Sequence, residues 1–211
     1  MLAKFAVLVD YYECSESVDL AVSVWIADLR TNTPIPATYC RDLVLWIWIS
    51  WTFKLSDLFE RATAVAIRQS TELVQNLGLP IPGWITDRLV SRRYRAMEAI
   101  VSGLSEQIYV YRSASYICPM STAHSLSCGG MLMGTLTKQM HSLDLTSSQL
   151  GFAFSGQTFD DLCMRARSIR SETWYHSNYN PHRCTLGAAI VPIVDLAVTM
   201  VVGLDLRDES A

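Results

Sequence analysis

The chain has 211 residues and a formal net charge of −3, and 50% of its residues are hydrophobic while only 18% are charged. Lys and Arg occur singly or in short groups, which gives no electrostatic footprint for a phosphate backbone, and we expect no nucleic-acid partner. The high apolar content predicts that part of the surface is covered by a protein partner or by a further domain.

The cysteines and the two longest apolar runs bear on where the protein resides. The 6 cysteines lie at wide, irregular intervals, unlike those of a secreted disulfide scaffold, and no signal-peptide pattern is present at the N-terminus. Leu43–Phe53 is too short to cross a bilayer, and Leu186–Leu204 is interrupted by Pro192 and Asp195. We therefore predict a cytoplasmic or nuclear protein with no membrane partner.

The first third of the chain is predicted to be helical. Residues 2–12 and 15–30 form two helices, and the second has an apolar face. Residues 41–53 are apolar on every side, so periodicity does not separate a buried helix from a strand. We predict a helix because no neighbouring segment offers a strand to pair with. A further helix is expected from Ser56 to about Val74.

The longest helix is predicted after the turn at Gly78–Pro82, with Arg88, Arg92, Arg93 and Arg95 on its solvated face. Residues 113–128 are predicted to form a loop that contains Cys118 and Cys128-Gly129-Gly130. Helices should follow at 132–143, 158–170 and 185–201, with loops between them. The predicted fold class is therefore all-α, a globular domain of about eight helices.

Several motifs, in this order along the chain, resemble the region that follows the BTB/POZ fold in a large group of fungal BTB-domain proteins. They are Leu2–Cys14, Trp25-Ile26, Trp46–Phe53, Leu79–Pro82, His182–Cys184 and Gly203–Leu206. The resemblance implies that residues 1–30 correspond to the closing helices of a BTB fold or to those just after it. Residues 31–211 would then form a helical C-terminal domain, and the BTB sheet itself would be missing from this chain.

Four residues in predicted loops or at helix starts form the best candidate site: Cys118, Cys128, His182 and Cys184. Thiolates and imidazoles are the ligands of structural zinc, so a tetrahedral zinc site is one interpretation. The spacing departs from standard zinc patterns such as paired C-x2-C. The other interpretation is that the cysteines are small buried hydrophobic residues beside a hydrogen-bonded histidine.

No nucleophile elbow, phosphate-binding glycine loop or other catalytic motif occurs, so we predict no catalytic residue and no organic cofactor. The leading hypothesis is a non-enzymatic protein-protein interaction or scaffold protein, with Trp84 and Trp174 beside loops as interface candidates. Two alternatives stay open. One is a zinc-dependent enzyme or small-ligand binder built on the Cys118–Cys184 loops, and the other is a transcriptional regulator that uses the Arg88–Arg95 face.

Overall fold

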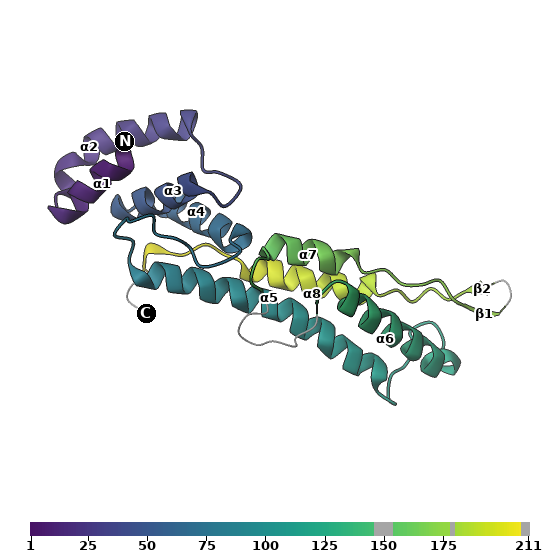
Figure 1. The fold of residues 1–211 in the computed structure, drawn as a ribbon. Coiled ribbons are helices and arrows are strands. Elements are labelled where there is room, and N and C mark those ends of the chain that lie inside the picture. Colours follow the sequence, from purple (N-terminus) through teal and green to yellow (C-terminus); the bar gives the residue numbers. More distant parts are fainter. Residues whose placement is uncertain (146–153, 178–179, 208–211) are drawn as a thin grey trace. The chain divides into compact units, whose positions relative to one another are not determined.

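A computed structural model describes residues 1–145, 154–177 and 180–207 of the chain. Within these ranges the chain forms eight α-helices, one short 3-10 helix (η1) and two short antiparallel strands, so the predicted all-α class is confirmed. Figure 1 shows the labelled helices and strands along the chain. The helices are α1 (Leu2–Tyr11), α2 (Ser15–Asn32), α3 (Arg41–Thr52), α4 (Ser56–Gln69), α5 (Gly83–Arg112), η1 (Thr122–His124), α6 (Ser125–Ser142), α7 (Phe159–Ser168) and α8 (Gly187–Met200). The strands are β1 (Tyr175–Ser177) and β2 (Asn180–Pro181).

The chain divides into two compact units. Unit 1 comprises Met1–Tyr94, Gly156–Phe159 and the described part of Val201–Ala211. Unit 2 comprises the described parts of Arg95–Ser155 and Asp160–Met200. The predicted division after residue 30 rests on the family resemblance alone and stays a prediction.

Helix α3 forms much of the core of unit 1, where it packs against α1 and α4. Its polar side chains are satisfied locally, because Ser50 donates to the Trp46 carbonyl at 2.6 Å and Thr52 donates to the Trp48 carbonyl at 3.0 Å. The Trp48 indole nitrogen donates to the Ala3 carbonyl at 3.2 Å. An apolar segment buried on all sides can therefore be a helix, and the prediction for residues 41–53 is confirmed.

The prediction for the arginines of α5 is wrong at Arg93, which is only 2% exposed. Its guanidinium donates to the carbonyls of Thr71 and Gln157, at 3.0 and 2.5 Å. Arg92 likewise donates to the carbonyls of Val202 and Gly203. These two arginines therefore bind loop carbonyls within unit 1. The amphipathic pattern of the helix had predicted that both side chains face solvent.

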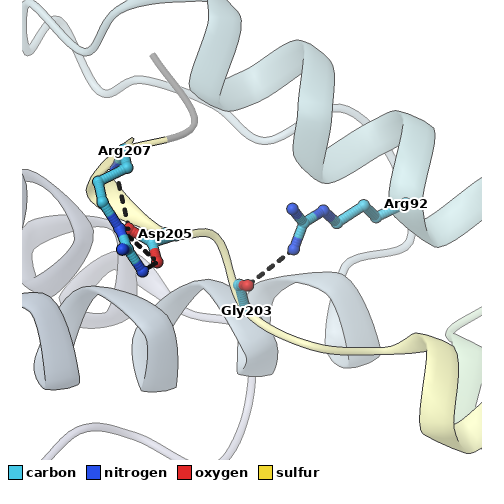
Figure 2. Close-up of polar contacts among 4 residues, drawn as sticks. All are labelled: Arg92, Gly203, Asp205 and Arg207. Carbon is cyan, nitrogen blue, oxygen red and sulfur yellow. Dashed lines mark hydrogen bonds and ion pairs between the residues drawn. The ribbon is translucent and has the colours of Figure 1, made fainter. Parts of the chain in front are cut away.

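The C-terminal segment, residues 201–207, packs in unit 1 without forming an α-helix. Arg92 donates to the Gly203 carbonyl at 2.7 Å, and Arg207 folds back onto Asp205 (Figure 2). Hydrogen bonds from Arg207 hold the pKa of the Asp205 carboxyl at about 2. The Leu204 amide donates to the Thr63 hydroxyl of α4 at 2.8 Å, and the Leu204 side chain is fully buried. The segment is thus anchored to both α4 and α5.

Unit 2 is built from the second part of α5 together with α6, α7 and α8. Helices α5 and α8 approach closely at Gly103, where a Cβ atom would lie 2.6 Å from a methyl carbon of Ile193. Helices α7 and α8 are joined by Arg167 and Asp195, whose nitrogen and oxygen are 2.6 Å apart. Within the described residues, no helix combines the length and the apolar content that a bilayer span requires.

Two predicted helix bounds are wrong. Helix α4 ends at Gln69, several residues before Val74, and the Thr71 carbonyl just beyond it accepts from Arg93 and from the Gly156 amide. Helix α6 begins at Ser125, so that Cys128 lies in its first turn where the sequence had predicted a loop. This second correction matters for the site, because Cys128 is held by helical backbone.

Candidate metal centre

The structure brings together the four candidate ligands predicted from the sequence, Cys118, Cys128, His182 and Cys184. Their ligand atoms all lie within 4.8 Å of one another, in a cluster able to hold a metal ion. Cys118, Cys128 and His182 are buried, and Cys184 is half-buried. All four belong to unit 2, so the whole cluster lies within one compact body.

Three separate segments supply the cluster. Cys118 lies in the loop between α5 and η1, and Cys128 lies in the first turn of α6. His182 and Cys184 lie in the segment between strand β2 and helix α8. A bound ion would therefore connect the segment 118–128 to the segment 182–184, which is more than 50 positions further along the chain.

The donor atoms converge on the His182 imidazole. Its Nε2 atom is 3.2 Å from the Cys128 sulfur and 3.4 Å from the Cys118 sulfur. The sulfurs of Cys118 and Cys184 are 3.7 Å apart. The same ring nitrogen thus faces two thiols at once, which positions it to share a metal ion with them.

The thiols differ in how readily they ionise. Burial raises the pKa of Cys118, but backbone hydrogen bonds from Ser121 and Met120, with further bonds from the neighbouring thiols, outweigh it and lower that pKa overall. Burial raises the pKa of Cys184 to about 12, and the adjacent Cys118 and Cys128 add to the effect. One thiolate is favoured, and further thiolates beside it are penalised by repulsion. A cation at the centre would remove that penalty.

Residues around the cluster fix the ligands in place. The Tyr116 hydroxyl lies 3.4 Å from the Cys128 sulfur, and Tyr116 packs edge-on against Tyr111 at a ring-centroid distance of 5.5 Å. The Ser125 hydroxyl accepts from the Cys118 amide at 3.1 Å. At Gly129 a Cβ atom would lie 2.8 Å from the Tyr111 carbonyl oxygen, so glycine lets α6 approach the end of α5. Neither Tyr116 nor Ser125 was predicted from the sequence to belong to the site, because a lone Tyr or Ser in a loop carries no metal-site signal.

The two tryptophans predicted at an interface both contact side chains of the chain itself. Trp174 stacks on the His182 ring, with centroids 4.3 Å apart and an interplanar angle of 32°, and its carbonyl accepts from the His182 amide. Trp84 meets Trp51 edge-on at 5.3 Å in unit 1. Both indole N–H groups are buried and have no hydrogen-bond partner among the described residues. Their interface role stays a prediction.

The fold and the cluster together define an all-α protein with a Cys3His group able to hold a metal ion. Comparisons of the chain with models of protein families, with curated proteins and with solved structures found no match.

Proposed function

We propose that this chain is a non-enzymatic protein-protein interaction or scaffold protein, and that Cys118, Cys128, His182 and Cys184 hold a structural zinc ion. The observation that carries the proposal is the convergence of four soft or borderline donors from three segments of unit 2. Structural zinc sites are almost always tetrahedral and use this type of donor set. The resemblance of the sequence to the helical region after a BTB fold supports the interaction role.

The donor distances suit zinc. Around a tetrahedral ion with Zn–S of about 2.3 Å and Zn–N of about 2.0 Å, two sulfurs lie about 3.8 Å apart and a sulfur and a nitrogen about 3.5 Å apart. The Cys118–Cys184 separation is 3.7 Å, and the two sulfur–nitrogen separations are 3.4 and 3.2 Å. These three separations match those of a tetrahedral zinc site, and all six donor pairs lie within 4.8 Å.

The same geometry argues against the zinc-enzyme alternative. Catalytic zinc keeps one coordination position open for water or substrate, whereas four protein donors close a tetrahedral site. The ligands are also mostly buried, with Cys128 at 0% and Cys118 at 2% exposure. The regulator alternative loses support as well, since Arg92 and Arg93 donate to carbonyls inside unit 1.

The metal content of purified protein tests the zinc proposal. The full chain, purified under reducing conditions without chelator, is expected to contain about one equivalent of zinc and to melt at a lower temperature after chelation. Less than about a tenth of an equivalent, with unchanged melting after chelation, would end the zinc interpretation. Crosslinking in the native cell tests the interaction role, and a monomer without partners that turns over a metabolite would contradict it.

Tyr116→Phe should weaken zinc binding without removing it. The substitution deletes the hydroxyl that contacts the Cys128 sulfur but keeps the ring that packs on Tyr111. Losing one outer contact to a metal ligand typically lowers affinity by about 10-fold or more. Competition with a chromophoric chelator measures the change. Tyr109→Phe is the matched control, because Tyr109 is 69% exposed, and equal affinities for the two variants would refute the role of Tyr116.

A further inference from the structure

A surface hollow of about 520 Å³ lies directly beside the proposed zinc site in unit 2. Its lining includes the end of α5, the following loop and the start of α6, through Tyr111, Arg112, Tyr116, Ser125, Leu126 and Met133. Two of these residues also contact ligands, because the Tyr116 hydroxyl lies 3.4 Å from the Cys128 sulfur and Ser125 accepts from the Cys118 amide. Tyr116 and Ser125 therefore both line the hollow and contact the cysteine ligands of the cluster.

The surface around the hollow is apolar and almost without charge. Leu126 lines the hollow and is 91% exposed, and Ile117 and Met120 in the adjoining loop are 66% and 54% exposed. From Ser113 to Thr137 the sequence contains no Asp, Glu, Lys or Arg. Single exposed apolar side chains are ordinary, but a group of them around a hollow marks an interaction surface.

One cation lines this hollow. Arg112 ends α5 and is exposed, and its side chain has no hydrogen bond or ion pair within the part of the chain that the structure describes. A guanidinium can donate two parallel hydrogen bonds to a carboxylate, the anionic group that protein segments carry. The charge complementary to this hollow is therefore a single carboxylate beside an apolar group.

We propose that the hollow docks a short peptide segment of a partner protein. The segment would place an apolar side chain against Leu126 and Met133, and an Asp, Glu or C-terminal carboxylate against Arg112. The volume lies in the range of pockets that enclose a small ligand or a few side chains. The inference rests on the proposed function, since a zinc-loaded cluster would hold Tyr116 and Ser125 in the wall.

Selection of displayed random peptides on the zinc-loaded full chain tests the proposal. Enriched sequences are expected to combine an apolar residue with a nearby carboxylate. Selection on the Arg112→Glu variant should instead enrich peptides that carry Lys or Arg at the position of that carboxylate. Leu126→Asp should weaken a selected peptide about 30-fold, the size typical of a hot-spot residue. Leu196→Asp is the matched control, because Leu196 is 65% exposed on α8 and does not line the hollow. This variant should bind the peptide as tightly as the parent does.

The outcomes separate this inference from the proposed function. A chain that binds zinc but selects no peptide, or whose peptides ignore both Arg112→Glu and Leu126→Asp, overturns the docking site alone. Self-association that Leu126→Asp abolishes also overturns it, because a second copy would then fill the hollow. A chain without zinc contradicts the proposed metal site, and a peptide whose affinity is unchanged by chelation contradicts the coupling of the hollow to that site.

Discussion

Cys128→Ser is expected to abolish stoichiometric zinc binding and to unfold the part of unit 2 around the cluster. The substitution removes a fully buried ligand and leaves three donors, while a serine hydroxyl is a poor zinc ligand. Binding of structural zinc supplies about 10–16 kcal/mol in zinc-finger peptides at neutral pH, and a whole domain is stable by only about 5–15 kcal/mol. Losing most of the free energy of zinc binding is therefore enough to unfold this region.

Hydrogen exchange and metal analysis check this expectation together. Amides of α6 and of residues 180–184 should lose protection in Cys128→Ser, while those of α3 in unit 1 keep it, because α3 packs against α1 and α4. Cys163→Ser is the matched control, since Cys163 is a buried cysteine of unit 2 that lies outside the cluster. Similar zinc content and similar exchange in the two variants would contradict a structural metal.

The four candidate ligands could be chosen from the sequence because cysteine and histidine are few and these four fall in or near irregular segments. Their convergence could not be derived, since the spacing matches no standard zinc pattern and the contacts span up to 66 positions. The Cys128-Gly129-Gly130 sequence was predicted to be a loop. Gly129 instead allows α6 to begin beside the Tyr111 carbonyl, which is a long-range packing requirement.

The same limit applies to the arginines and the C-terminal segment. Helical periodicity predicted that Arg92 and Arg93 face solvent. The local pattern around a charged residue does not reveal that a carbonyl from a distant segment will accept its hydrogen bonds. The acceptors for Arg92 are 110 and 111 positions away. Local pattern therefore gives the helices and much of the core, while tertiary contacts decide which polar residues serve the fold.

Gly203→Ala is expected to destabilise unit 1 by about 4 kcal/mol. A Cβ atom at this position would lie 1.8 Å from the Glu60 carbonyl oxygen and 2.8 Å from the Glu60 Cα atom, which belong to the backbone of α4. The C-terminal segment would have to move away, because the helix backbone cannot yield. That movement breaks the Leu204–Thr63 hydrogen bond and the Arg92–Gly203 hydrogen bond. Overpacking costs about 1–3 kcal/mol, and each orphaned buried group about 1–3 kcal/mol more.

Gly134→Ala makes the same chemical change with the opposite expected sign. Gly134 lies inside α6, and a Cβ atom there would meet no atom within 4 Å. Alanine has the higher helix propensity, so this variant should gain about 0.5–1 kcal/mol. Urea unfolding of the parent and both variants measures the difference. A Gly203→Ala variant as stable as the parent would mean that the C-terminal segment is not clamped between Glu60 and Arg92, because a clamped glycine has no room for the added methyl group.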